Sequence, residues 1–345
     1  MFKISVGYNG KPGFAEVIAK YKEHVADIYF VAPFMPSGRG SPGDAGEQVY
    51  TLRLHELLKF AMNEGIRMNI LFNALCLGEG YGSPIIGQAL AETMQFYIQT
   101  YNIASATVVS VIDGELIKKR FPRINVHASV NMFIRNPHQA LEVAHIADTI
   151  VLDRNVNRDL NLIREIKEQS GKHIRLLVNE ACVPECMNRV QHFNRISHQA
   201  GDPEPFYLPC VQRYHNDPAV LFKSPIVRPE DVHHYEGLVD SIKIASRASD
   251  TEKIETMLRA YSTGTFDGNL FEIVESGGLD TFIAEWREIH KADTVGDPYL
   301  DNSVVPDDFH EHVTTCDRYC HKCNYCNEIA KKAFRWLDKA VEVKV

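Results

Sequence analysis

The 345-residue sequence has no run of about 18 or more apolar residues, so it predicts no membrane-spanning helix. Its first residues lack a basic segment followed by an apolar one, so we expect no signal peptide and a cytoplasmic protein. An excess of positive charge is also lacking, because 45 Asp and Glu face 37 Lys and Arg, a formal net charge of -8. Broad nucleic-acid binding, which needs a basic surface, is therefore not expected, although a local basic patch stays open.

Several common catalytic motifs are missing as well. The chain contains no H-E-x-x-H zinc motif and no G-x-S-x-G nucleophile motif. The stretch Gly78–Gly82 has neither the Lys-Ser/Thr of a phosphate-binding P-loop nor the spacing of a dinucleotide-binding motif. The cysteines are the strongest chemical signal that remains.

Eight cysteines are spread unevenly along the chain. Six lie in two groups at short spacing and two stand apart: Cys182 with Cys186, then Cys316, Cys320, Cys323 and Cys326, and singly Cys76 and Cys210. A reducing cytosol disfavours structural disulfides, and a chain of this size does not need them. Clustered thiols in such a compartment indicate metal binding.

Short apolar, β-branched segments predict eight strands, at residues 3–8, 27–32, 67–73, 106–112, 125–129, 149–152, 174–179 and 241–245. Amphipathic patterns between them predict helices at residues 13–24, 52–64, 86–101, 138–147 and 157–170. Eight strand–helix units in about 260 residues are typical of an α/β fold of the (β/α) TIM-barrel type. A doubly wound sheet is the alternative.

The pattern changes after the helix predicted at residues 251–261. A glycine-containing turn, a segment at 285–290 and an acidic loop at 297–308 lead to the cysteine cluster, and a helix predicted at 328–341 follows. We therefore predict a barrel domain over residues 1–262 and a cysteine-rich C-terminal appendage over residues 263–345, packed on the barrel.

Functional residues of a (β/α) barrel gather where the strands end and the βα loops begin. Four predicted strands carry polar side chains there: Arg39 after the second, Asn73 after the third, His127 in the fifth and Glu180 after the seventh. Each has a plain structural alternative, because a lone strand His is often a core residue and a loop Arg often points to solvent. Glu180 and Arg154 could likewise form a structural ion pair.

Four segments occur in the order found in a known family, namely Asn125–Ser129, Val151–Arg154, Glu180–Cys182 with Cys186 and Cys210, and Asp240–Arg247. On these segments the sequence resembles, over roughly residues 1–262, the collagenase-like peptidases of family U32. The resemblance implies a barrel fold and a 4Fe-4S cluster. It also implies oxygen-independent hydroxylation, because several members hydroxylate ubiquinone rings or bases of tRNA and rRNA.

The first group of cysteines is expected at the mouth of the barrel. Cys182, Cys186 and Cys210 would ligate one 4Fe-4S cluster, since soft thiolates suit iron–sulfur clusters or zinc. Family members usually carry a fourth barrel cysteine, which is absent before the last predicted strand. Cys76, at the end of the third strand, is the candidate replacement, with a C-terminal cysteine or a non-protein ligand as alternatives.

The second group places four cysteines within eleven residues, from Cys316 to Cys326. One short loop can wrap these thiolates around a second 4Fe-4S cluster, whereas structural zinc sites generally use two separated pairs, so zinc is the alternative. Two clusters would let the C-terminal one relay electrons to the barrel. The first three cysteines imitate the radical-SAM spacing, but they lie at the far end of the chain beside a fourth cysteine, so that chemistry is not expected.

Together these features predict an oxygen-sensitive iron–sulfur enzyme for redox or hydroxylation chemistry on a small anionic molecule. His127 would transfer a proton, because its unperturbed pKa lies near neutrality, with Glu180 as its partner. The substrate would be held by Asn73 and by four cations: Arg39, Arg154, Lys243 and Arg247. The alternatives are a metal-linked peptidase, or a non-catalytic cluster-bearing subunit of an electron-transfer or RNA- or quinone-modifying complex. A protein redox partner or a homologous subunit would complete the assembly.

Overall fold

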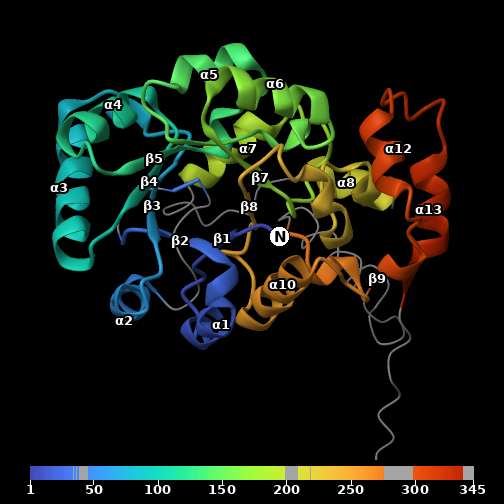
Figure 1. Ribbon diagram of the computed structural model, residues 1–345, viewed down its shortest axis with the longest axis horizontal. Coiled ribbons are helices and arrows are strands. Elements are labelled where there is room, and N and C mark those ends of the chain that lie inside the picture. The colour runs from blue at the N-terminus through green and yellow to red at the C-terminus, as the bar shows by residue number, and fades with distance from the viewer. Residues whose placement is uncertain are drawn as a thin grey trace, which may run out of the picture.

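A closed barrel of eight parallel strands, in the chain order β1 to β8, forms the centre of the molecule (Figure 1). The computed structural model describes residues 1–33, 35, 37–38, 46–198, 209–217, 219–275 and 298–336. The strands are β1 Ile4–Gly7, β2 Val25–Val31, β3 Met68–Phe72, β4 Ser105–Val108, β5 Asn125–Ala128, β6 Thr149–Val151, β7 His173–Leu177 and β8 Ser241–Lys243. Ile4 of β1 pairs with Ile242 of β8, which closes the sheet. The predicted TIM-type barrel is confirmed, and the doubly wound alternative is wrong.

Helices surround this barrel (Figure 1). Those of the barrel part are α1 Phe14–Tyr21, α2 Glu47–Asn63, α3 Pro84–Tyr101, α4 Val111–Arg120, α5 Pro137–Val143, α6 Leu160–Ser170, α7 Arg189–Ser197, α8 Pro209–Asn216, α9 Val220–Lys223 and α10 Thr251–Thr263. Several begin at side-chain caps, which satisfy amides that lack a partner in the first turn. Asn136 accepts from the amide of Gln139 and Asp159 from that of Leu162.

One strand boundary differs from the sequence prediction for a local reason. The fourth strand, predicted to reach residue 112, ends at Val108. Ser110 has extended backbone angles, and its hydroxyl accepts a hydrogen bond from the amide of Asp113. This N-cap starts α4 at Val111, so the apolar Val111 and Ile112 belong to the helix rather than the strand.

The barrel interior holds a buried polar network instead of an all-apolar core. Ser5 donates to Asp27, and Asp27 pairs with Arg175 at 2.8 Å. On the opposite strands, Thr107 donates to the side chain of Asn69, which also contacts His127. Apolar residues close the interior toward the carboxyl ends of the strands in two small clusters: Tyr29, Val31 and Leu71, and Val130, Val151, Leu177 and Ala245.

The described part of the appendage consists of β9 Pro298–Leu300, α12 Phe309–Thr315, α13 Tyr325–Ala333 and β10 Phe334–Trp336, with β9 and β10 antiparallel. It packs on the barrel part through the rings of Phe222 and Phe309, whose centroids lie 5.8 Å apart. The helix predicted at 328–341 differs from the structure, because α13 starts at Tyr325 and gives way to a strand at Phe334. Residues 337–341 of that prediction lie outside the described residues. Aromatic residues favour strands, and the backbone there pairs with β9.

The remaining predictions about this region are untested. The segment at residues 285–290 lies outside the described residues. The domain boundary at residues 262 and 263, which falls beside the end of α10 at Thr263, stays a prediction about folding units.

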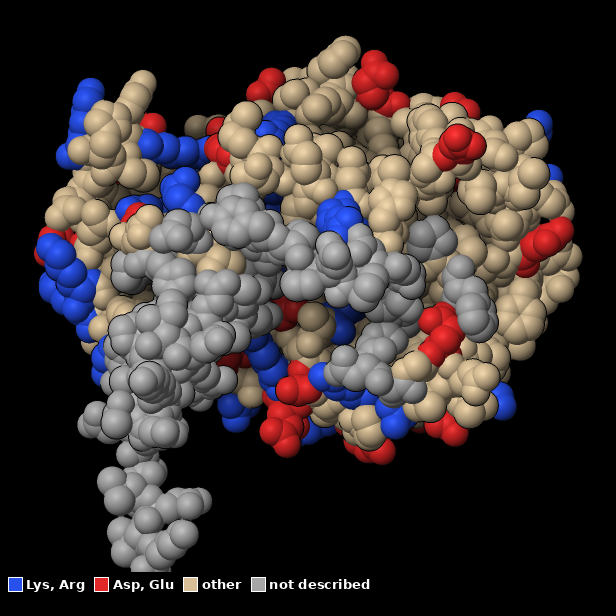
Figure 2. All heavy atoms as spheres, turned by 180° about the vertical axis from the view of Figure 1, so that it is seen from behind, with Lys and Arg blue, Asp and Glu red and all other residues tan. Residues whose placement is uncertain are grey.

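Two further observations concern the described helices and the charges on the outer surface. Among the described residues, no helix combines the length and apolar character needed to cross a membrane. On the face shown in Figure 2, acidic and basic side chains are interspersed among uncharged ones.

Candidate functional site at the barrel mouth

A small cavity lies at the carboxyl ends of the barrel strands. Its described walls enclose about 50 Å³. The lining includes four of the residues predicted to bind substrate and one predicted catalytic residue: Asn73, Arg154, Lys243, Arg247 and Glu180. The structure thus brings together residues that the sequence separates by up to 174 positions, from 73 to 247. The fifth predicted substrate ligand, Arg39, lies outside the described residues.

Gly38 closes one wall of this cavity by close backbone approach. Its amide donates to the side-chain oxygen of Asn73 at 3.0 Å. A Cβ at this position would lie 2.6 Å from the amide nitrogen of Asn131 and 2.7 Å from the carbonyl oxygen of Asn73, so only glycine fits without movement. The buried side-chain oxygen of Asn131 has no hydrogen-bond partner among the described residues, which leaves an acceptor at the cavity.

Lys243 lines the cavity with an amine whose pKa lies near neutral pH. Its Nζ lies 3.3 Å from the centroid of the Tyr29 ring. Burial lowers the pKa of Lys243 to about 7, with Asp27 opposing the shift and the positive charge of Arg175 adding to it. The amine can therefore gain or lose a proton near neutral pH.

Arg247 reaches the cavity by a route that differs from the prediction. The last barrel strand, predicted at residues 241–245, ends at Lys243, so Arg247 lies in the loop beyond it. The chain beyond β8 nevertheless brings Arg247 to the mouth, where its guanidinium donates to the hydroxyl of Ser37 at 3.2 Å. Asn179 holds this segment in place by pairing with both backbone groups of Ala245, at 2.7 and 3.0 Å.

Arg154 connects the cavity to the cysteines. It is 1% exposed and forms an ion pair with the buried carboxylate of Glu180. The same guanidinium lies 3.7 Å from the sulfur of Cys182. Burial and the carboxylate of Glu180 raise the pKa of the Cys182 thiol, while Arg154 opposes that shift. The buried guanidinium of Arg154 therefore contacts the Cys182 thiol and also lines the mouth cavity.

His127 lies inside the barrel rather than in the lining of the mouth cavity. Its Nδ1 is 2.8 Å from the side-chain nitrogen Nδ2 of Asn69, in the polar network described above. Burial, with the positive charge of Arg175, lowers the pKa of His127 to about 3, so the ring is neutral at physiological pH. The structure pairs Glu180 with Arg154, and the predicted pairing of Glu180 with His127 does not occur.

The three barrel-mouth thiols come from two neighbouring segments. Cys182 and Cys186 lie between β7 and α7, and Cys210 lies in the first turn of α8. The hydroxyl of Tyr214 in α8 donates to the carbonyl of Ala181, which holds α8 against the segment that carries Cys182. Burial raises the pKa of Cys210 to about 11, and the proximity of Cys182 and Cys186 adds to the shift. The thiols therefore lie close enough to interact electrostatically.

Cys76 lies in the loop after β3, half-buried, where its sulfur accepts a hydrogen bond from the amide of Gly78 at 3.4 Å. The amide of the preceding residue, Leu75, donates to Ser197 of α7, so this loop is tied to the helix that follows Cys186. Its role as fourth ligand stays a prediction.

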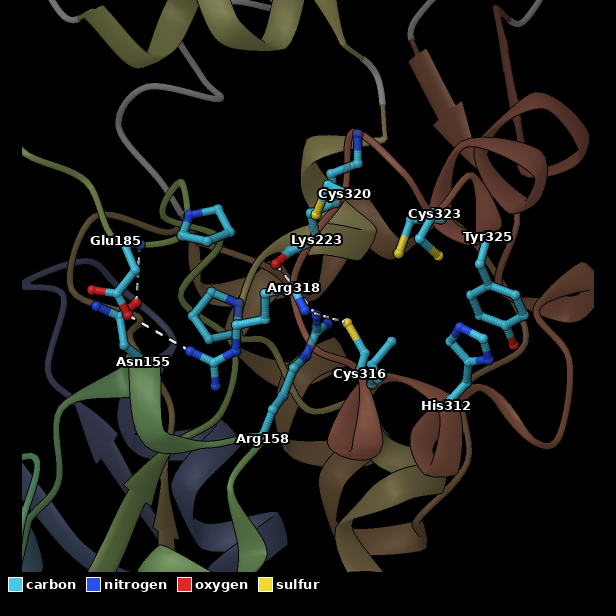
Figure 3. A pocket seen from close by; sticks show the side chains of 14 residues that line it. Asn155, Arg158, Glu185, Lys223, His312, Cys316, Arg318, Cys320, Cys323 and Tyr325 are labelled. Atoms are coloured by element: carbon cyan, nitrogen blue, oxygen red, sulfur yellow. Dashed lines mark hydrogen bonds and ion pairs between the residues drawn. The ribbon is translucent and has the colours of Figure 1, made fainter.

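A second cavity, of about 260 Å³, is lined by all four C-terminal cysteines (Figure 3). Cys316, Cys320 and Cys323 lie on the segment between α12 and α13, and Cys326 lies in the first turn of α13. The opposite wall comes from the barrel part and includes Asn155, Arg158, Pro184, Glu185 and Lys223.

The donor sets fit thiolate-ligated metal in chemistry, because each consists of several cysteines beside an arginine. Within the part of the chain that the structure describes, no three Cys, His, Asp or Glu side chains stand at the spacing of a single-metal site. The barrel set offers three thiols, and both the cluster and its fourth ligand stay predictions.

Several lining residues were not among the predicted site residues, and Gly38, Asn131 and Tyr29 are three of them. Asn131 had a signal, because it follows the fifth strand directly and such positions line the mouth of a barrel. Tyr29 lies within the predicted second strand with its neighbours Ile28 and Phe30, and nothing local distinguishes it from a core aromatic.

Comparison with known proteins gives a relative at the sequence level and a match of fold among solved structures. The chain is 29% identical over 331 residues to a protein of Methanocaldococcus jannaschii named "Uncharacterized protease MJ1657", covering 92% of this chain and 91% of that protein. The solved structure of the U32 peptidase Mk0906 matches 71% of this chain and 93% of its own, with a TM-score of 0.55 and 18% identity, which is a likeness of fold. No family model matches.

Proposed function

We propose that this chain, which is similar to the U32 collagenase-like peptidases as its motifs predict, is an iron–sulfur enzyme that binds a small anionic molecule at its barrel mouth. The chemistry would be redox or oxygen-independent hydroxylation. One observation carries the proposal: Arg154, almost fully buried, lies 3.7 Å from the sulfur of Cys182 and pairs with Glu180 in the wall of the mouth cavity. A thiolate-bound group and a substrate would therefore be neighbours.

The charge of the cavity supports an anionic substrate. Among its described lining residues, Arg154, Lys243 and Arg247 are basic, and Glu180 is the acidic one. Glu180 compensates Arg154, so the lining keeps a positive excess from Arg247, which increases when Lys243 is protonated. The cavity of about 50 Å³ has room for more than one water molecule, which needs at least about 10–15 Å³ of such space, so a small group can enter.

Cys182, Cys186 and Cys210 would hold the cluster, which would supply electrons or act as a Lewis acid. Lys243 would exchange a proton at its Nζ, because burial brings its pKa to about 7 and it lines the cavity. We assign it the role predicted for His127, whose buried neutral ring contacts Asn69 within the barrel. Asn73 and Asn131 would orient the substrate, and the Tyr29 and Phe193 rings would exclude water.

The cluster assignment is tested by metal analysis after anaerobic purification. Wild-type protein should contain iron and acid-labile sulfide that single changes Cys182→Ala, Cys186→Ala and Cys210→Ala each reduce. Met187→Ala is the matched control, because Met187 lies beside Cys186 and is 87% exposed. If all three cysteine variants keep the full iron and sulfide of wild type, the proposed function is wrong.

The metal-linked peptidase is the second candidate, favoured by the names of the M. jannaschii protein and of the matching structure. A labelled protein substrate such as casein separates the two. Peptide hydrolysis that persists in air and in Cys182→Ala would establish the peptidase and exclude a cluster-dependent reaction. If neither hydrolysis nor redox turnover occurs in a preparation with full iron content, the chain acts as a cluster-bearing subunit.

A further inference from the structure

We infer that Cys316, Cys320, Cys323 and Cys326 hold a second iron–sulfur cluster, in a cavity formed jointly by the appendage and the barrel loops. The first support is convergence. The four cysteines lie within eleven consecutive positions, in the loop that follows α12 and in the first turn of α13, and all four line one cavity. Figure 3 shows the labelled sulfurs on the appendage side, facing residues of the barrel part.

The second support is charge. A cluster held by four thiolates is anionic overall, so its site needs compensating cations. Three basic residues line the cavity, namely Arg158, Lys223 and Arg318, against the single carboxylate of Glu185 among the described lining residues. The backbone amide of Arg318 already donates to the sulfur of Cys316 at 3.2 Å, a bond of the kind that tunes cluster sulfurs.

The third support is a set of buried donors without partners. Asn155 is 7% exposed and lines the cavity, and its side-chain nitrogen has no hydrogen-bond partner among the described residues. The Nε of Arg158 likewise has no hydrogen-bond partner among the described residues, although its terminal nitrogens donate to the carbonyls of Phe222 and Lys223. Leaving buried donors unsatisfied is costly, and sulfur acceptors in this cavity would satisfy them.

The size of the cavity favours a cluster over zinc. A single Zn²⁺ draws its thiolates to about 2.3 Å and needs no surrounding space. The four cysteines line a cavity of about 260 Å³, which leaves room for a polynuclear iron–sulfur cluster. Cys320 and Cys323 are exposed, so this cluster would face solvent, where an external one-electron donor can reach it.

The test is anaerobic reconstitution of the full chain with ferrous iron and sulfide, followed by metal and sulfide analysis. If both sites fill, wild type should hold about eight iron atoms per chain, and Cys320→Ser with Cys323→Ser should hold about half as many. Both cysteines are exposed, so their loss leaves the packing unchanged, and a thermal melt verifies folding. His321→Ser, an exposed change in the same loop, is the control and should retain all iron.

Each result is decisive. Full iron in the double cysteine variant, zinc in place of iron in the purified wild type, or equal iron loss in His321→Ser would overturn the four-thiolate cluster. The test is independent of the barrel cluster. If Cys182→Ala, Cys186→Ala and Cys210→Ala keep all iron while the C-terminal variant loses it, the proposed function fails and this inference stands.

Discussion

The carboxylate of Glu185 lies 3.8 Å from the guanidinium of Arg318 and so joins the two cysteine-bearing segments of the molecule. Glu185 directly precedes Cys186 at the barrel mouth, and Arg318 lies between Cys316 and Cys320 in the appendage. Both residues adopt left-handed backbone angles, with φ of 47° and 63°. Such angles are unfavourable outside glycine and concentrate at functional sites. One ion pair therefore connects the segments that carry the two sets of thiols.

The backbone of Arg318 gives a direct prediction. An L-residue in the left-handed region costs about 1–2 kcal/mol relative to right-handed angles, and glycine does not bear this cost. Arg318→Gly should therefore be about 1 kcal/mol more stable to urea than Arg318→Ala. Both variants lose the half-exposed ion pair with Glu185, which contributes less than about 1 kcal/mol. Equal stability of the two variants would show that the left-handed angle is not maintained.

The Arg154–Glu180 pair should dominate the stability of the mouth. Arg154→Met removes the buried guanidinium that pairs with the buried Glu180 carboxylate, and breaking a buried pair costs about 3–5 kcal/mol. Adding Glu180→Gln should restore part of the loss, because it removes a buried negative charge that Arg154 no longer compensates. Urea denaturation measures both effects. Lys331→Met breaks an exposed pair with Glu328 and should cost less than about 1 kcal/mol, so an equal loss there would contradict the argument.

Anion binding at the mouth should depend on pH through Lys243. Because its pKa lies at about 7, the side chain is charged below that value and neutral above it. Sulfate, which keeps its charge between about pH 6 and about pH 9, should bind more weakly as pH rises through this range. Calorimetry should show weaker binding in Lys243→Met with little remaining pH dependence. If the double variant Lys243→Met, Arg247→Met binds sulfate as tightly as wild type does, the mouth cavity is not an anion site.

His127 should make the fold sensitive to acid. Burial lowers its pKa to about 3 in the folded chain, from 6.5 as the ordinary value. Between these values the unfolded chain binds a proton that the folded chain does not, so stability falls as pH falls, by up to about 1.4 kcal/mol per pH unit. His127→Gln should show a shallower loss in urea denaturation between about pH 6 and about pH 4.

The acid experiment involves a second acid-sensitive residue and has a matched control. Asp27, whose pKa the neighbouring Arg175 lowers in spite of burial, adds acid sensitivity at still lower pH. His138→Gln is the matched control, because that His side chain is 85% exposed on α5. An identical slope in wild type and His127→Gln would mean that the ring is not buried in its neutral form.

Much of the barrel could be predicted because its signals are local. Each strand is an apolar, β-branched segment between helical patterns, and all eight strands occur where the sequence places them. Their ends were less predictable, since a single cap such as Ser110 decides whether Val111 extends a strand or starts a helix. The last predicted helix failed at Phe334 because a distant strand, β9, offers its backbone a partner.

By itself, the sequence determined the barrel, the two groups of cysteines and the polar residues at the strand ends, because periodicity and spacing are properties of neighbouring positions. Tertiary structure alone decided their partners. Glu180 meets Arg154 and not His127, because the two lie at the mouth while the His127 ring points into the interior with Asn69. The cavity between appendage and barrel likewise exists only when segments more than one hundred positions apart, such as Glu185 and Arg318, pack together. Burial and charge compensation depend on side chains that are close in space, and the local sequence does not show which distant side chain will be the neighbour.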